Sequence, residues 1–185
     1  MIQKAMKGMI CMLLIFYGIA CKNKAHLFDV DEYRIGVKHR SIRGTIFKQS
    51  YPFNRFFVND VDSTFRWTPT AEDIELAEKI LCQQIAELNA DRVNQVDNCP
   101  TIHKHLSKYF RQYVGITNDN GQRVIHVNFY WSRYSLWDKW RGINDDRLRF
   151  WDDYEVVFDG CSYYWQVNIN LDNMILSDLS INGIS

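Results

Sequence analysis

Residues 71–91 have the sequence AEDIELAEKILCQQIAELNAD, in which apolar residues recur at spacings of three and four. This period predicts a helix of about five turns with one apolar face. The predicted apolar stripe consists of Ile74, Ala77, Leu81, Ile85 and Leu88. Glu75 and Lys79 are four residues apart, a spacing that favours an ion pair on the solvent side of a helix.

The residues just before this stretch are typical of a helix N-terminus. Thr68 or Thr70 can accept a hydrogen bond from a backbone N–H of the first turn, and Pro69 suits that turn. Glu72 and Asp73 complement the positive end of the helix dipole. The helix is therefore expected to begin close to residue 71.

After residue 109 the apolar period changes from helical to alternating, which predicts β-strands. Asn118 to Gly121 reads Asn-Asp-Asn-Gly and predicts a tight turn between strands at 109–117 and 124–131, since Asn-Gly tolerates positive φ. Phe110, Val114 and Ile116 are expected on one face of the first strand. Further strands are expected at 154–158, 162–171 and 175–181, and a short one at 65–67. For the rest of 36–67, short strands and an irregular wrap both fit.

One long helix followed by a meander of antiparallel strands predicts an α+β fold. The helix should pack across one face of a curved sheet, an outline shared by cystatin-like and NTF2-like folds. We expect one domain over residues 36–185. An outline of this kind carries no function with it.

The N-terminus carries a second pattern. Lys4 and Lys7 precede the apolar run 9–20, which is shorter than the roughly 20 residues that a membrane span needs. A basic region, a short apolar region and small residues predict an export signal over residues 1–20. Residues 21–35 have little periodicity and are expected to form a tether.

The end of this run, Gly18-Ile19-Ala20-Cys21, resembles the lipobox of bacterial lipoproteins, although Gly18 stands where Leu is usual. The resemblance implies cleavage before Cys21, acylation of Cys21 by chains such as palmitate, and attachment to a membrane. Lys22 after the cysteine resembles the sorting pattern that allows transit to the outer membrane. A plain secretory signal cut after Ala20 and a buried N-terminal helix are the alternatives.

Composition excludes some partners. Removing residues 1–20 takes away only Lys4 and Lys7 among the charged residues, and leaves slightly more acidic than basic residues. No strong field then attracts nucleic acid, so a nucleic-acid partner is not expected. Aromatic residues make up 15% of the chain, which argues against disorder.

Beyond residue 21 the chain has three cysteines, Cys82, Cys99 and Cys161. An exported protein can keep a disulfide, but three cysteines allow at most one intramolecular bridge. Cys82 and Cys99 are the only local pair. The alternative is three separate thiols, with Cys82 and Cys161 packed as small hydrophobic residues.

Residues 131–151 combine aromatic side chains with arginines, the residue types of binding hot spots. The candidate binding surface consists of Trp131, Tyr134, Trp137, Trp140, Arg141 and Trp151. Stacked aromatic rings also suit the faces of sugars, so a protein and a glycan are both candidate ligands. The alternative is that these rings pack on the sheet edge.

Catalytic and metal-binding patterns are weak. His103 and His105 are two residues apart, but only Asp97 and Cys99 are near enough in sequence to complete a metal site. Asp153, Glu155 and Asp159 offer carboxylates without an identifiable nucleophile. We therefore expect no metal, no cofactor and no catalytic residue that the sequence alone can name.

The second half of the chain resembles small lipoproteins of the Bacteroidota without an assigned function. The resemblance covers roughly residues 67–185 and rests on Thr68-Pro69-Thr70, Arg111-Gln112-Tyr113-Val114-Gly115, Asp159-Gly160-Cys161 and Ile181-Asn182-Gly183. It implies no catalytic residues. The sequence therefore favours a non-catalytic binding or inhibitory domain on a membrane anchor. The alternative is an envelope hydrolase with its site on the concave face of the sheet.

Overall fold

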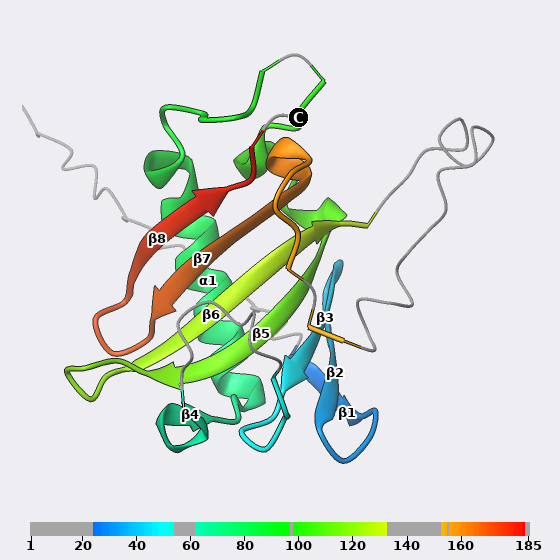
Figure 1. Cartoon of the computed structure of the whole chain (residues 1–185), viewed down its shortest axis with the longest axis vertical. Coiled ribbons are helices and arrows are strands. Elements are labelled where there is room, and N and C mark those ends of the chain that lie inside the picture. The colour runs from blue at the N-terminus through cyan, green and yellow to red at the C-terminus, as the bar shows by residue number, and fades with distance from the viewer. Residues whose placement is uncertain (1–23, 54–61, 97, 133–152, 155, 184–185) are drawn as a thin grey trace, which may run out of the picture.

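The computed structural model describes residues 24–53, 62–96, 98–132, 153–154 and 156–183. One helix packs against an eight-stranded, mostly antiparallel sheet that does not close into a barrel (Figure 1). This confirms the α+β class and the helix-on-meander outline. The predicted signal, residues 1–20, and Cys21 lie outside the described residues.

The sheet has the order β1-β2-β3-β5-β6-β7-β8, and β4 pairs with β5 beside the end of β3. All neighbouring strands are antiparallel except β3 and β5. Parallel neighbours need a long crossover, and here the connection contains α1. The strands are β1 (His26–Asp29), β2 (Arg34–His39), β3 (Ile42–Phe47), β4 (Arg66–Trp67), β5 (Tyr109–Thr117), β6 (Arg123–Trp131), β7 (Tyr164–Asn170) and β8 (Ile175–Ile181).

The N-terminal strands correct the expected tether. β1 and the start of β2 lie within residues 21–35, and Leu27 pairs with Val37 in the sheet. Val37 is fully buried, because this part of the sheet contributes to the same core as the later strands. The folded domain therefore includes residues 26–35, and the open question for 36–47 is decided in favour of strands.

The helix α1 spans Ala71–Leu88 and begins as the sequence predicts. Thr70 is its N-cap: the Thr70 hydroxyl accepts from the Asp73 N–H, and the Asp73 carboxylate accepts from the Thr70 N–H. Pro69 lies before the cap rather than inside the first turn. Leu88, expected in the apolar stripe, is 40% exposed because the helix ends at this residue.

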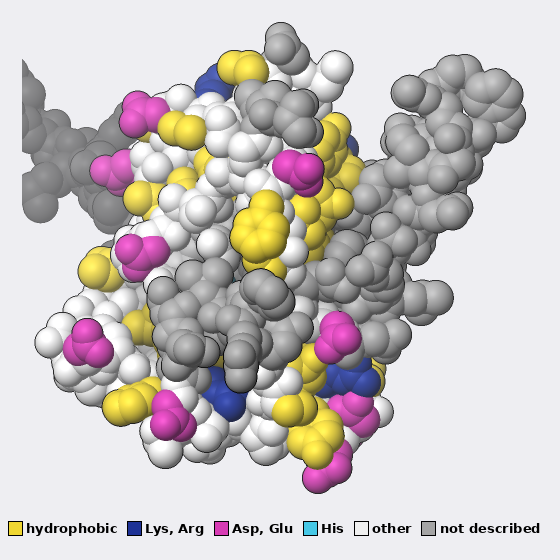
Figure 2. Space-filling view, in the orientation of Figure 1, with side chains coloured by type: hydrophobic (Ala, Val, Ile, Leu, Met, Phe, Trp, Pro, Cys, Tyr) yellow, Lys and Arg dark blue, Asp and Glu magenta, His cyan; other side chains and the backbone are white. Residues whose placement is uncertain are grey.

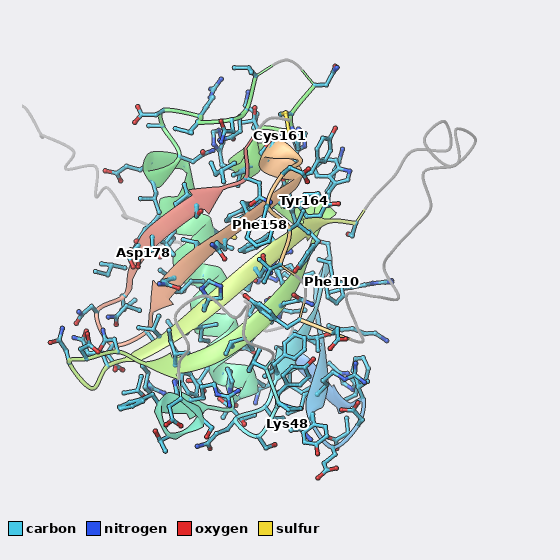
Figure 3. All side chains as sticks on the ribbon, in the orientation of Figure 1. Lys48, Phe110, Phe158, Cys161, Tyr164 and Asp178 are labelled. Atoms are coloured by element: carbon cyan, nitrogen blue, oxygen red, sulfur yellow. A yellow bond between two sulfur atoms is a disulfide. The ribbon has the colours of Figure 1, made fainter. Side chains whose placement is uncertain are left out.

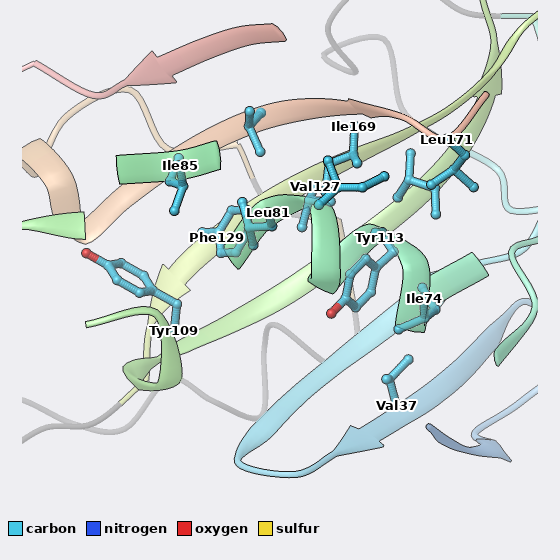
Figure 4. Close-up of a cluster of buried hydrophobic side chains, with 14 of the residues drawn as sticks. Val37, Ile74, Leu81, Ile85, Tyr109, Tyr113, Val127, Phe129, Ile169 and Leu171 are labelled. Atoms are coloured by element: carbon cyan, nitrogen blue, oxygen red, sulfur yellow. The ribbon is translucent and has the colours of Figure 1, made fainter. Parts of the chain in front are cut away.

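The main core lies between α1 and one face of the sheet. Ile74, Leu81 and Ile85 point from the helix toward Tyr113, Val127 and Phe129 of the sheet (Figure 4). Phe129 stacks on Trp165 with 3.6 Å between ring centroids. This face of β5 carries Tyr109, Arg111 and Tyr113, so it is as buried as the face of Phe110 and Val114. Alternation therefore marks the strand but does not separate its core face from a solvent face.

The strand expected at 154–158 does not form in the described residues. Tyr154 and Val156 to Phe158 belong to no strand. The backbone there is held instead by the Asn182 side chain, whose Nδ2 donates to the carbonyls of Val157 and Asp159. The chain turns at Gly160, at φ 87°, and re-enters the sheet as β7.

The disulfide joins Cys99 to Cys161, a pair 62 residues apart, and Cys82 is free. The bridge lies at the end of the sheet where β7 begins (Figure 3). This overturns both sequence-based expectations, Cys82–Cys99 and three separate thiols. Cys82 lies in the middle of α1, while the loop after α1 brings Cys99 to the turn that carries Cys161.

Among the described residues, no helix combines the length and the apolar character needed to span a bilayer.

Candidate functional site

A cleft of about 680 Å³ separates α1 from the hairpin of β2 and β3. We call it the helix–hairpin cleft. Its volume falls within the range of about 300–1,000 Å³ that is typical of small-molecule sites. The side chains that matter for its chemistry are Lys24, His39, Arg40, Ile42, Glu72, Glu75, Leu76, Glu78, Lys79, Cys82 and Gln83.

Glu78 is an unusual residue for the buried side of α1. It is 4% exposed, and its Oε1 accepts from Arg111 Nε and from the Tyr113 hydroxyl, each at 2.7 Å. Arg111 is 1% exposed and also donates through Nη1 to the Tyr109 carbonyl. Charges this deeply buried need a partner, because desolvation of a lone ion costs several kcal/mol. The three side chains therefore form one charge-paired unit at the base of the cleft.

A glycine in β3 makes room for this unit. A Cβ on Gly44 would lie 2.6 Å from the Arg111 carbonyl oxygen and 2.7 Å from the Tyr113 ring. No side chain fits at that distance, so β3 can pair with β5 here only through glycine. Because Gly44 has no side chain, Arg111 and Tyr113 can pack closely against the backbone of β3.

Two buried polar atoms at the cleft have no hydrogen-bond partner among the described residues. They are Oε2 of Glu78 and Nδ1 of His39. Buried polar groups are normally satisfied, and leaving one unpaired costs about 1–3 kcal/mol. Both residues line the cleft. A bound molecule with a donor for the carboxylate and a polar group for the imidazole would satisfy them.

The Cys82 thiol lies at the same cleft and is not activated. Cys82 is part of α1, and partial burial of its thiol raises the pKa. The negative charge of Glu78 raises the pKa further. Reactive cysteines instead have a lowered pKa, because the thiolate is the nucleophile. A cysteine, a histidine and a glutamate thus line one cleft without the electrostatics of a nucleophilic site.

The lining of the cleft carries balanced charge. Its acidic side chains are Glu72, Glu75 and Glu78, and its basic side chains are Lys24, Arg40 and Lys79. Glu75, which the sequence paired with Lys79, accepts from the Ala25 backbone N–H at 2.7 Å. This bond fixes the start of the folded chain against α1. The lining as a whole suits a neutral or zwitterionic ligand with an apolar part that contacts Ile42 and Leu76.

The face of the sheet away from α1 holds a second polar arrangement. Asn168 donates through Nδ2 to Asp178, so its Oδ1 faces Nδ1 of His126, at 2.8 Å. Nδ1 must then carry the proton, which leaves Nε2 to accept from the Tyr154 hydroxyl at 3.1 Å. Burial lowers the pKa of His126, which favours the neutral imidazole.

The aromatic surface predicted at 131–151 lies mostly outside the described residues. Tyr134, Trp137, Trp140, Arg141 and Trp151 cannot be placed. Trp131 ends β6 and is partly buried, with edge contacts to the rings of Tyr109 and Tyr163. Trp131 therefore packs on the end of the sheet, which is the alternative to a binding role that the sequence left open.

His103 and His105 have separate partners, and Asp97 lies outside the described residues. His103 lies near Asn89, with 3.3 Å between Nδ1 and the amide nitrogen, while the His105 ring packs against Trp131. Within the described ranges, no group of three or more His, Cys, Asp or Glu side chains is arranged to hold a metal ion. Asp153, a candidate for acid–base chemistry, accepts a hydrogen bond from the Tyr51 hydroxyl.

No protein-family model matches this chain, and neither the curated proteins nor the solved structures contain a match. The resemblance to small Bacteroidota lipoproteins therefore stays a prediction. The site has to be judged from its own residues.

Sequence analysis missed the helix–hairpin cleft. The one available sign was Glu78, a charged residue directly after Ala77 on the apolar side of the helix. Its partners Arg111 and Tyr113 are more than 30 residues away, on the face of β5 that looked more polar. Only the packing of α1 on β5 brings them together.

Proposed function

We propose that this chain is an exported, lipid-anchored binding protein that holds a small ligand in the helix–hairpin cleft. The observation that carries the proposal is the cleft of about 680 Å³ lined by Glu78 and His39. Each of these buried residues has a polar atom that finds no hydrogen-bond partner in the described part of the chain. A ligand with hydrogen-bonding groups at one end could pair with these two polar atoms, while an apolar part could contact Ile42 and Leu76. Balanced charge in the lining favours a neutral or zwitterionic molecule.

The chemistry of the cleft favours binding over catalysis. The Cys82 pKa is raised, so a nucleophilic thiolate is disfavoured. Glu78 is already engaged, because its Oε1 accepts hydrogen bonds from both Arg111 and Tyr113. What the cleft offers is an acceptor, an imidazole and an apolar wall in fixed positions.

The anchor proposed at Cys21 would hold this cleft near a membrane. Lys24 lines the cleft, and Cys21 is three residues earlier. Three residues span at most about 11 Å of extended chain. An acylated Cys21 would therefore place the opening of the cleft close to the headgroup region, and a ligand could come from the membrane surface. The disulfide supports export, because such bonds persist in oxidising compartments.

Native mass spectrometry on protein purified from envelope membranes tests the binding function. We expect a small molecule to be retained by the wild-type protein and lost from Gln83→Trp, which fills the cleft from an exposed position on α1. Glu87→Trp is the matched control, because Glu87 is exposed on the same helix and does not line the cleft. Absence of a retained molecule, or equal retention by Gln83→Trp, would contradict the proposal.

The anchor is tested separately by Cys21→Ser. Wild-type protein should label with radioactive palmitate and sediment with membranes, and Cys21→Ser should do neither. Unmodified wild-type protein that remains soluble after export would show that the chain is secreted without an anchor.

An envelope hydrolase is the second candidate, favoured by the oriented imidazole of His126 on the face away from α1. Its Nε2 is the acceptor nitrogen and contacts the Tyr154 hydroxyl, and a chain of hydrogen bonds through Asn168 to Asp178 holds the ring. Turnover of a panel of chromogenic esters and glycosides, lost in His126→Gln, would support this alternative. No turnover by the wild type would leave the binding function.

A further inference from the structure

A second pocket, of about 240 Å³, lies on the opposite side of the sheet from the helix–hairpin cleft. It is bounded by β6, β7 and β8 on one side and by residues 156–158 on the other. We call it the strap pocket. Its polar lining consists of Asn128, Gln166, Ser180 and Asn182. Among its described lining residues none is charged.

The wall formed by residues 156–158 is held in place by the fold. Asn182 Nδ2 donates to the Val157 carbonyl at 2.5 Å and to the Asp159 carbonyl at 2.9 Å. The Cys161 N–H donates to the Gly183 carbonyl, and the disulfide ties Cys161 to Cys99. The pocket is therefore shaped before any ligand arrives, which lowers the entropic cost of binding.

Phe158 stands at this pocket with 80% of its surface exposed, the largest exposure among the large hydrophobic side chains described. Figure 3 shows it over the middle of the sheet, and Figure 2 shows hydrophobic side chains on the same face. Covering an exposed Phe ring is favourable, because it removes apolar surface from water. Here the backbone on both sides is fixed while the ring remains open to solvent.

We propose that the strap pocket binds a neutral sugar, with Phe158 as the platform for one face of the ring. A pyranose presents C–H groups on its faces and hydroxyl groups around its edge. An exposed aromatic ring suits the first. The Gln166 carboxamide and the Ser180 hydroxyl, which can both donate and accept, suit the second. The volume admits about one sugar ring, so a longer glycan would extend beyond the pocket. The uncharged lining disfavours acidic sugars and phosphorylated ligands.

Isothermal titration calorimetry with chitotriose and maltoheptaose tests this assignment, with oligogalacturonate as the charged comparison. We expect at least one neutral oligosaccharide to bind and the charged one to bind at least tenfold more weakly. Phe158→Trp should keep or improve the affinity, while Phe158→Leu should weaken it about tenfold because it keeps apolar area but loses the aromatic face.

Two controls separate this pocket from other surfaces. Phe65→Ala removes another exposed ring, 56% exposed and remote in sequence, and should leave sugar binding unchanged. Gln83→Trp, which fills the helix–hairpin cleft, should also leave sugar binding unchanged. The sugar site and the proposed ligand site in the cleft are thereby tested separately. The proposal is overturned if no neutral oligosaccharide binds, or if Phe158→Leu binds as tightly as the wild type.

Discussion

Glu78 places a carboxylate on the buried face of α1. It lies on the core side of α1, where an apolar residue would normally pack, and it is paired with Arg111 and Tyr113. Burial and the charge of Glu78 both raise the pKa of Tyr113, so the phenol stays protonated and donates. The unit is neutral overall, which is how two ions can be accommodated in the core.

Removing one partner of this pair should be far more damaging than removing both. We expect Glu78→Leu to lower the free energy of unfolding by about 3–5 kcal/mol, because it leaves Arg111 buried without a counter-charge. The double variant Glu78→Leu/Arg111→Met should recover most of that loss. Urea denaturation followed by circular dichroism measures both. Glu87→Leu, on the exposed side of α1, is the control and should change stability by about 0.5 kcal/mol or less. A double variant that is no more stable than Glu78→Leu would contradict the view that the unpaired Arg111 charge causes the loss.

His126 predicts a pH dependence of stability. Burial lowers its pKa below the ordinary value for histidine, so the unfolded chain binds a proton at a higher pH than the folded chain does. Stability is then complete above about pH 6.5 and falls as the pH decreases toward the folded pKa. His105 contributes in the same direction, because desolvation and neighbouring lysines lower its pKa.

Chemical denaturation between pH 5 and 8 checks this. The wild type should lose stability below about pH 6.5, and His126→Gln should show a smaller slope, with the remainder due to His105. Between pH 7.5 and 8.5 the free energy of unfolding of both proteins should stay constant, because the histidines are neutral in both the folded and the unfolded chain. A difference between the two proteins in this range then reports the lost hydrogen bonds, and a pH-dependent difference reports titration. A slope unaffected by His126→Gln would locate the titration elsewhere.

At the scale of the elements, α1 is the clearest success of sequence analysis. Its period, its N-terminus and its acidic first turn are local properties, so residues within a few positions of one another determine them. The strand expected at 154–158 failed for the opposite reason. Its residues have strand propensity, but the Asn182 side chain holds the backbone carbonyls outside the ladder. Strand propensity has an effect only where a neighbouring strand is free to pair.

The capping box at the start of α1 gives an element-scale prediction. Thr70→Ala removes the hydroxyl that accepts from the Asp73 N–H and should cost about 1 kcal/mol of stability. Thr70→Ser keeps an acceptor at the same position and should stay close to the wild type. Thermal unfolding of the three proteins measures the difference, and an equal loss in Thr70→Ser would show that the methyl group matters instead.

At the scale of the molecule, the sheet is built from two parts joined by the parallel pairing of β3 and β5 (Figure 1). Between those strands the chain passes through β4 and α1, and among the strands α1 lies closest to β7 and β8. The helix–hairpin cleft is where α1 and the N-terminal hairpin diverge, and the strap pocket lies on the other side. Two separate surfaces are thus available for ligands on one small domain.

The Cys99–Cys161 bridge ties the loop after α1 to the start of β7, and its removal should destabilise the whole domain. For a separation of 62 residues we expect a loss of about 2–4 kcal/mol on reduction or in Cys99→Ala/Cys161→Ala. Thermal unfolding with and without reductant measures it. Cys82→Ala is the control and should remain close to the wild type. Peptide mapping that finds Cys82 in a disulfide within the chain would contradict the pairing.

The sequence by itself determined the local elements: the helix that begins at residue 71, though it ends at Leu88 rather than near 91, the hairpin around Asn118–Gly121 and the strands β7 and β8. Helical and alternating periods, a cap and a turn are interactions between near neighbours, and one segment contains all of them. Tertiary structure alone decided the partner of Cys99, the burial of Glu78 against Arg111, the inclusion of residues 26–35 in the sheet and the existence of both pockets. Each of these depends on which distant segments meet, and several pairings satisfy the same local pattern until the core packs in one arrangement.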